Sequence, residues 1–258
     1  MMPFKRVKPA LGTFFEITLK NVSSERGIAL TSYSFNEVYR LEKIFNVFDP
    51  KSELSLINRS ILGTKFLLSD ELFHVLSFGQ EAEIHSTRAF RLMPLCEHDF
   101  GKCYELGSNS VTRLSPCQFD LGGIAKGFIV DCIFNDLRER SPEADIFINA
   151  GGDLRCHGEE IIELRVPTLG DEKCFAINNF KGAMATSSLL GEGIARYSTS
   201  FLRGPFDPST VTVGTDSCMS ADTVTKVLLF AKSVNQSLDP TIFPTIFSLS
   251  FNSLGCTL

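Results

Sequence analysis

The chain has 258 residues, of which 43% are hydrophobic and 21% are charged, with 23 phenylalanines and no tryptophan. This composition is typical of a globular protein and excludes a disordered or fibrous chain. The net charge is −5 and no basic block stands out, which argues against a nucleic acid as the partner. The length allows one large domain or two small ones, each with a hydrophobic core.

The two ends of the chain predict neither a signal peptide nor a membrane span. Residues 1–20 contain basic side chains, but no long apolar stretch and no lipobox-like cysteine, so a cytoplasmic protein is expected. Residues 241–258 are uncharged but contain Pro244, Asn252 and several hydroxyl residues, which favours strands over a spanning helix. The eight cysteines are scattered without a CxxC pair, and we expect reduced thiols in the core.

The first predicted elements lie in the N-terminal third of the chain. Residues 11–20 (LGTFFEITLK) alternate between apolar and polar side chains, which predicts a strand. The first helix is predicted over residues 33–47 and ends before Asp49-Pro50. Its apolar face consists of Phe35, Val38, Leu41 and Phe45. A second helix is expected to begin at Ser69 or Asp70 and to run to about Glu83.

The remaining predicted elements follow turns rich in glycine or serine. A third helix begins near Gly123 and runs to about Arg140, and residues 145–149 (DIFIN) predict a buried strand. Two further strands are predicted at residues 161–166 and 174–178. A fourth helix begins near Ser220 and has an apolar stripe formed by Val224, Val227, Leu228 and Ala231. Strands and helices thus mix without a regular βαβ alternation, which indicates the α+β class.

Residues 119–131 (FDLGGIAKGFIVD) form the first segment that suggests chemistry. A glycine pair before a helix lets the backbone approach an anion, and the helix N-terminus favours negative charge. Lys126 follows in the helix and can reach a phosphate. The segment matches neither the P-loop nor the Rossmann fingerprint. The alternative is a tight strand-to-helix turn with a surface lysine.

Two further segments carry acidic side chains at turns or helix starts. In NAGGDLRCHG (149–158), Asp153 either faces a ligand or closes a local turn. In SCMSADTVTKVLLF (217–230), Ser220 suits a helix N-cap, and Asp222, Thr225 and Lys226 share one polar face. A carboxylate beside a hydroxyl suits Mg²⁺, which takes oxygen ligands. The alternative is a helix-start aspartate paired with the lysine.

Taken together, these segments resemble the ApbE family of FAD:protein FMN transferases from about Ala10 to about Leu229. The most specific stretch is DLGGIAKGFIVD (120–131). The other similar segments, in the family's order and spacing, are LGT (11–13), FDPKSELSLINRS (48–60), NAGGDLRCHG (149–158), MATSS (184–188), DPST (207–210), VTV (211–213) and SADTVTK (220–226).

The resemblance implies an ApbE-like, T-fold-like α+β domain over residues 1–258, with mixed, largely antiparallel sheets and packed helices. It also implies an enzyme that binds FAD with Mg²⁺ and transfers FMN to a Thr or Ser hydroxyl of a flavin-acceptor protein, releasing AMP. Phosphoryl transfer depends mainly on positioning and charge neutralisation, which suits a cation and a cradle of backbone groups.

The resemblance also implies roles for individual residues. The Gly123 carbonyl, Asp222 and Thr225 would hold the metal, and Asp222 would be the catalytic residue through that metal. Asp120 and Lys126 would contact FAD. The flavin pocket would be lined by Leu11, Phe48, Ala89, Phe90 and Arg91. Phe48 is expected to stack on the ligand, where many relatives have tyrosine.

Four positions depart from the family pattern. Arg88 stands where the family usually has glycine, Arg91 where it has aspartate, and Gly204 where it often has histidine. Lys226 stands where the family has its metal-binding threonine. The Lys226 ammonium either takes the space and charge of the cation or simply pairs with Asp222.

Three functions therefore remain open from the sequence. The first is a Mg²⁺-dependent transferase that moves FMN from FAD onto a protein hydroxyl. The second is a homologue that binds FAD or another nucleotide but has lost transfer activity, with Lys226 in place of the metal. The third is a structural homologue that acts through protein contacts alone. FAD uptake separates the third from the others, and a flavin-labelled acceptor separates the first from the second.

Overall fold

The computed structural model describes residues 2–86, 88–96, 103–167, 172–188, 210–230 and 247–251. The helices in this part of the chain are α1 (Ser24–Phe45), α2 (Glu53–Asn58), α3 (Asp70–His85), α4 (Ala125–Arg140) and α5 (Cys218–Phe230). The strands are β1 (Phe4–Ala10), β2 (Thr13–Lys20), β3 (Lys65–Leu67), β4 (Tyr104–Gly107), β5 (Ser110–Arg113), β6 (Asp145–Ala150), β7 (Asp153–Pro167), β8 (Glu172–Ser188), β9 (Thr210–Thr215) and β10 (Phe247–Phe251). The predicted α+β class is confirmed.

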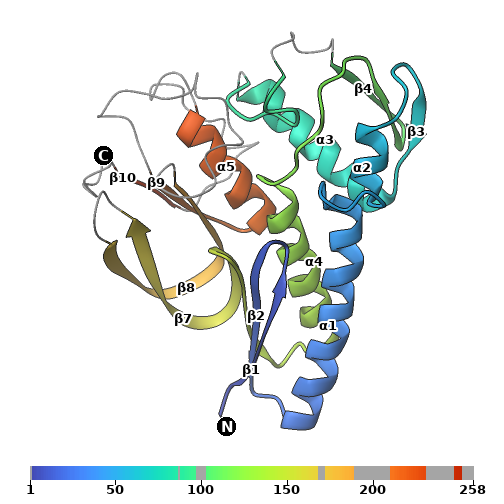
Figure 1. Cartoon of the computed structure of the whole chain (residues 1–258). Helices are drawn as coiled ribbons and strands as arrows, with labels where there is room; N and C mark the ends of the chain where they lie inside the picture. The colour runs from blue at the N-terminus through green and yellow to red at the C-terminus, as the bar shows by residue number, and fades with distance from the viewer. Residues whose placement is uncertain are drawn as a thin grey trace.

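The strands form two sheets, and every described pairing is antiparallel (Figure 1). The larger sheet has the order β1-β2-β6-β7-β8-β9-β10, and the smaller one the order β3-β5-β4. The β1–β2 hairpin turns at Leu11 and Gly12, whose φ angles are 57° and 71°. Two consecutive positive φ angles are typical of the tight turns whose twist matches that of a hairpin.

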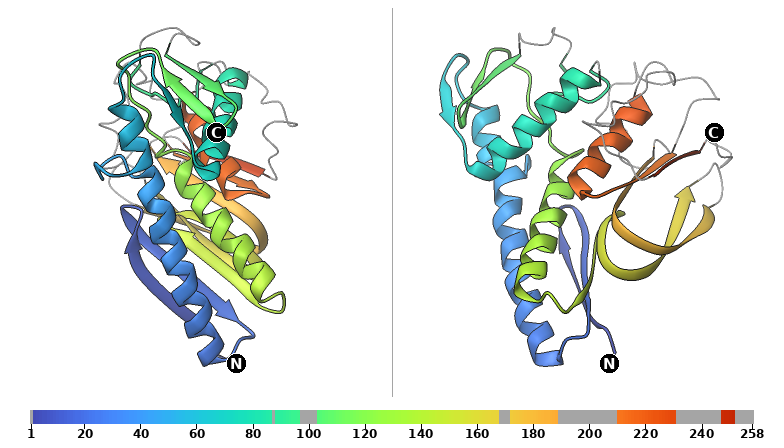
Figure 2. Two further views of the ribbon diagram at one scale, coloured as in Figure 1. Left: turned by 90° about the vertical axis from the view of Figure 1, so that its right-hand side faces the viewer. Right: turned by 180° about the vertical axis from the view of Figure 1, so that it is seen from behind.

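The helices cover the larger sheet and bring distant segments together. Helices α1 and α4 lie side by side against the β1, β2 and β6 part of the sheet (Figures 1 and 2). Helix α5 packs on β8 and β9 and touches α4. The smaller sheet, α2 and α3 lie around the C-terminal end of α1 (Figure 1). The main core, which includes Phe15, Phe35, Ile129 and Val224, is shared by these layers.

The predicted elements are present, but several boundaries differ. The predicted strand at residues 11–20 is β2, preceded by the unpredicted edge strand β1. Helix α1 begins nine residues earlier than predicted, because Ser23 caps it by accepting a hydrogen bond from the Arg26 N–H. Phe35, Val38, Leu41 and Phe45 are buried as expected. Helix α3 begins after Ser69, as predicted.

The start of α5 corrects a sequence prediction. The helix begins at Cys218, and the Ser217 hydroxyl, not that of Ser220, accepts a hydrogen bond from a first-turn N–H. The predicted strands at 161–166 and 174–178 are parts of the longer β7 and β8. The sequence did not predict a helix at α2 or strands at β3, β4, β5 and β9. Ala231 and Gly204 lie outside the described residues.

The C-terminal segment agrees with its prediction where the structure describes it. Strand β10 falls within the predicted terminal strands of residues 241–258 and pairs with β9. Among the described helices, none combines the length and the apolar character that crossing a membrane requires.

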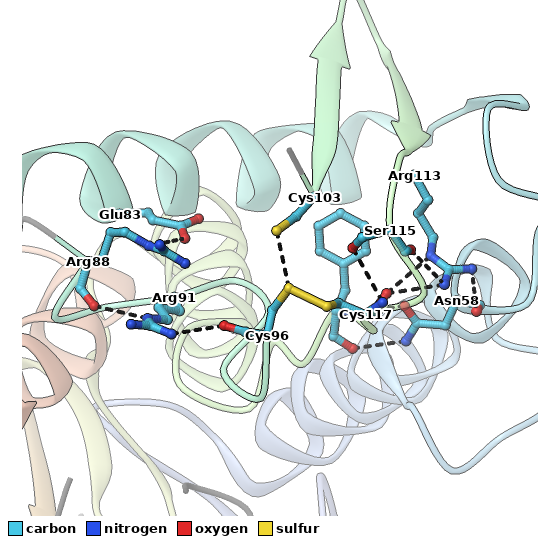
Figure 3. The surroundings of a disulfide bond; sticks show 10 residues. Asn58, Glu83, Arg88, Arg91, Cys96, Cys103, Arg113, Ser115 and Cys117 are labelled. Carbon is cyan, nitrogen blue, oxygen red and sulfur yellow. Dashed lines mark hydrogen bonds and ion pairs between the residues drawn. A yellow bond between two sulfur atoms is a disulfide. The ribbon is translucent and has the colours of Figure 1, made fainter. Parts of the chain in front are cut away.

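A disulfide corrects the expectation that all cysteines are reduced. Cys96 and Cys117 are joined, and the Cys103 sulfur lies 3.1 Å from that of Cys96 (Figure 3). The Arg113 guanidinium donates to the carbonyls of Ser115 and Cys117 and so holds the second half-cystine in place. Single-sequence reasoning missed this bond because the two cysteines are 21 positions apart and meet only through tertiary structure.

Candidate functional site

Two adjoining cavities open where the end of α1 meets the start of α4. One, of about 480 Å³, is lined by Leu11, Gly12, Glu42, Phe45, Asn46, Val47, Phe48, Asp120, Leu121, Gly122, Ala125, Lys126 and Ile129. The other, of about 580 Å³, is lined by Val47, Phe48, Pro50, Ser55, Asn58, Arg59, Pro94, Leu95, Cys117, Gln118, Phe119 and Asp120. The two share Val47, Phe48 and Asp120, so the exposed Phe48 ring stands between them.

Loops and turns fix the walls of the first cavity. The Leu11 N–H at the β1–β2 turn donates to Glu42 Oε1 of α1 at 2.9 Å. Asp120 Oδ1 accepts from the Gly122 N–H at 2.9 Å, which holds the glycine turn before α4. The N-cap residue of α4, Ile124, provides no side-chain hydrogen bond. The N–H groups of Ile124 and Ala125 donate to the Leu121 carbonyl, at 3.1 and 2.8 Å. Helix N-termini attract anions through their dipole as well, and the anion cradle stays a prediction.

Behind this turn, two lysines and two aspartates form a charge cluster composed of Lys126, Asp153, Asp222 and Lys226. Lys126 of α4 is paired with Asp153 at the start of β7. Lys226 is paired with Asp222 one turn earlier in α5, with 2.7 Å between Nζ and Oδ1. The two aspartate side chains are 1% and 0% exposed. Lys126 is therefore part of an ion pair at the wall of the cavity, and the surface-lysine interpretation is wrong.

Burial and charge shift the pKa values of this cluster in different directions. Burial and the Asp222 charge raise the pKa of Asp153, although Lys126 opposes them. Burial also acts to raise the pKa of Asp222, but the ammonium groups of Lys226 and Lys126 outweigh it and lower that pKa. The carboxylates of Asp153 and Asp222 outweigh burial at Lys126 and raise its pKa above the ordinary value. Lys126 is therefore a permanent cation.

The Lys226 ammonium is surrounded by oxygen atoms. Besides Asp222, it contacts the Ser187 hydroxyl of β8 at 2.5 Å and the Thr225 hydroxyl at 3.4 Å. The hydroxyls of Ser187 and Thr225 lie 2.7 Å apart, and Thr225 donates to the Asp222 carbonyl at 2.7 Å. A Cβ on Gly123 would stand 3.2 and 3.3 Å from the Cγ and Cε atoms of Lys226. The side chain therefore crosses the glycine turn.

This arrangement does not fit the Mg²⁺ ion that the resemblance implies. Asp222 Oδ2 is buried without a hydrogen-bond partner among the described residues, and it is the one atom of the cluster that would suit a cation. The other carboxylate oxygen and both hydroxyls contact the Lys226 ammonium. Mg²⁺ requires a shell of oxygens, and an ammonium in contact with the same carboxylate would repel it. The Lys226 ammonium is therefore a fixed cation beside the predicted metal ligands Gly123, Asp222 and Thr225.

The structure brings only some of the predicted flavin-contacting residues to one cavity. Leu11, Phe48, Asp120 and Lys126 line it together. Phe90 is buried, and its ring faces Gly123 on the side of Lys226. Neither Ala89, Phe90 nor Arg91 lines either cavity. Arg91 donates instead to the carbonyls of Arg88 and Cys96, and burial lowers its pKa (Figure 3).

Two residues that matter to the site were missed from the sequence. Ser187, within the MATSS segment, contacts Lys226 from β8. Asp131 of α4 accepts from the backbone N–H groups of Cys218 and Met219, both at 2.9 Å, and so holds the start of α5. The one available signal for Asp131 was a charged residue inside the apolar run FIVDCIF, since a buried charge requires partners.

Comparisons with known proteins agree with this fold. Flavin transferase ApbE from Vibrio cholerae has 16% sequence identity to this chain and a TM-score of 0.79, over 99% of this chain and 96% of that one. The ApbE protein from Thermotoga maritima has 17% identity and a TM-score of 0.80, over 100% and 96%. Flavinyl transferase ApbE from Pseudomonas stutzeri has 16% identity and a TM-score of 0.78, over 99% and 92%.

At this level of identity the structural matches establish the fold, and the assignment of family rests on the sequence. The sequence model of the ApbE family matches residues 11–238, most of the chain. This range contains the glycine turn, the charge cluster and all the lining residues of both cavities. The chain belongs to the ApbE family.

Proposed function

We propose that the protein binds FAD and transfers its FMN moiety to a Thr or Ser hydroxyl of a flavin-acceptor protein, releasing AMP. The single observation that carries this proposal is the cavity in which Phe48, Asp120 and Lys126 meet the N-terminus of α4. An aromatic ring suits an isoalloxazine, and a lysine with a helix N-terminus suits a pyrophosphate. Family membership and the names of the structural relatives support the same chemistry.

The residues have distinct tasks in this proposal. Phe48, whose side chain stands between the two cavities, stacks on the flavin ring. The glycine turn at residues 122–123 allows the phosphates to approach the N-terminal end of α4 and its dipole. Lys126 neutralises the pyrophosphate from a position that Asp153 fixes. Asp222 is the proposed catalytic residue and acts through the Lys226 ammonium that it holds.

The transfer step is a substitution at phosphorus. The acceptor oxygen forms a bond to the phosphorus on the FMN side, and the bond from that phosphorus to the bridging oxygen breaks. AMP leaves with the bonding electron pair, and the proton of the acceptor hydroxyl passes to solvent or to the phosphate of the departing AMP. Catalysis of such a step consists mainly of positioning and charge stabilisation, which the lysines of the cluster supply.

The experiment is an in vitro flavin-transfer assay. We expect purified protein, FAD and an acceptor domain that contains a flavinylation site to yield an acceptor heavier by one FMN residue in intact-mass spectrometry. The acceptor with its Thr replaced by alanine is the control. Bound FAD without a mass increase, with or without Mg²⁺, would contradict transfer.

That outcome would favour the second candidate, a nucleotide-binding homologue without transfer activity. The specific observation in its favour is the ion pair of Lys226 with Asp222 at the predicted metal position. The single-domain organisation over residues 1–258 and the cytoplasmic location remain proposals.

A further inference from the structure

The Lys226 ammonium has the contacts of a bound cation rather than those of a surface lysine. Its side chain is 16% exposed, and Nζ contacts one carboxylate and two hydroxyl oxygens from two elements, β8 and α5. A free surface lysine samples many rotamers, whereas this one is held at several points. These oxygen atoms thus fix a unit positive charge beside the glycine turn at residues 122–123.

Among the described residues, the charges of the four-residue cluster balance without a metal. Lys126 and Lys226 carry two positive charges, and Asp153 and Asp222 carry two negative charges when ionised. A divalent cation added to this set would leave an excess of two positive charges in a buried region. Removing Lys226 would instead leave one negative charge in excess and expose both oxygens of Asp222 to a cation.

From this geometry we infer that Lys226 replaces a divalent cation, so that the protein binds the pyrophosphate of a dinucleotide without metal. The inference rests on the proposed FAD site and specifies its electrostatics. The Cγ and Cε atoms of Lys226 lie against Gly123, and the neighbouring Gly122 lines the cavity together with Lys126. A tethered ammonium supplies a fixed positive charge and cannot be removed by a chelator.

The first test measures metal binding without FAD. Mn²⁺, followed by its electron paramagnetic resonance signal, serves as the probe for the wild-type protein and for Lys226→Thr. We expect no Mn²⁺ bound to the wild type at this cluster and stoichiometric binding to Lys226→Thr, which restores an oxygen ligand beside Asp222. The inference would be overturned if the wild type bound Mn²⁺ stoichiometrically and Asp222→Asn abolished that binding.

The second test measures FAD affinity by quenching of flavin fluorescence, in EDTA and in excess Mg²⁺. We expect equal affinities for the wild type in the two buffers. Lys226→Thr should bind about tenfold or more weakly in EDTA and recover in Mg²⁺, because it loses the fixed positive charge beside the phosphates. Lys226→Met should stay weak in both buffers. Lys65→Thr, which removes an exposed lysine on β3, is the matched control and should behave as wild type.

The outcomes separate this inference from the proposed function. Wild-type binding that requires Mg²⁺ would overturn the inference and leave flavin transfer standing. Binding in EDTA without FMN transfer would support the inference and reject the transfer. If the wild type bound no FAD in either buffer, the proposed function would fall, and the Mn²⁺ comparison would decide the inference alone. Melting temperatures of the variants, compared with wild type, exclude loss of folding as the cause.

Discussion

Replacing Gly127 with alanine is expected to destabilise the protein by about 3 kcal/mol, the cost of overpacking a tight contact. An added Cβ would lie 2.4 Å from the Cys218 carbonyl oxygen and 2.8 Å from the Met219 Cα. These are backbone atoms of the first turn of α5, and the N–H groups of both residues are bound to Asp131. The strain has no flexible side chain to absorb it.

Helix propensity alone predicts that Gly127→Ala stabilises the protein. Gly127 lies in the first turn of α4, and an alanine in a helix is about 1 kcal/mol more favourable than a glycine. The matched control is Gly123→Ala, whose Cβ would meet only side-chain atoms of Lys226 and Phe90, at 3.2 Å or more. Urea denaturation of the two variants is the measurement. Equal stability of both variants, or a more stable Gly127→Ala, would contradict the close crossing of α4 and α5.

This crossing links the fold to the proposed chemistry. Helix α4 carries Lys126, and α5 carries Asp222 and Lys226. Since Gly127 allows the two backbones to touch, it brings these charged side chains to one place. Gly127, which has no functional side chain, therefore helps to determine the geometry of the charge cluster.

Replacing Asp131 with alanine is expected to cost about 3 kcal/mol of stability, which combines the loss of a helix cap with that of a buried ion-pair partner. Its carboxylate accepts from the N–H groups of Cys218 and Met219 and from the Ser217 hydroxyl. It also pairs with Arg155 of β7 at 2.7 Å. One side chain thus anchors the start of α5 to α4 and to the sheet.

The control for Asp131 lies five residues further along the same helix. Asp136 pairs with Arg140 at the surface, and exposed pairs of this kind contribute well under about 1 kcal/mol. Asp136→Ala should therefore leave the urea midpoint nearly unchanged, while Asp131→Ala lowers it clearly. If the two variants lost the same stability, the capping role of Asp131 would be wrong.

The sequence predicted best those elements whose signals are local. The helix α3 followed from its Ser69 cap and apolar spacing, and the core face of α1 followed from four apolar residues. The strand β1 was missed because its neighbour β2 alone carries a buried face; its own side chains are mostly half-buried or exposed. The start of α5 was misplaced because its first two N–H groups are bound by Asp131, 87 positions before Cys218, in addition to the local Ser217 hydroxyl.

The candidate site shows the same limit. Family motifs predicted Leu11, Phe48, Asp120 and Lys126, and the structure places all four at one cavity. Arg91, predicted to line the flavin pocket, lines neither cavity, and its guanidinium donates to backbone carbonyls. Lys126 and Lys226 are paired with Asp153 and Asp222, which the net charge of the chain does not reveal. Pairing of this kind arises only in three dimensions.

The measurement that tests the central claim most directly is a titration of FAD against wild type and Phe48→Ala, followed by flavin fluorescence. Phe48 is 71% exposed between the cavities, so its loss should change the fold little. We expect saturable binding to the wild type and about tenfold weaker binding to Phe48→Ala, the value of one stacking contact. Phe175→Ala, on β8 and outside both cavities, should bind as wild type. Equal affinity of Phe48→Ala and wild type would contradict the placement of FAD in these cavities.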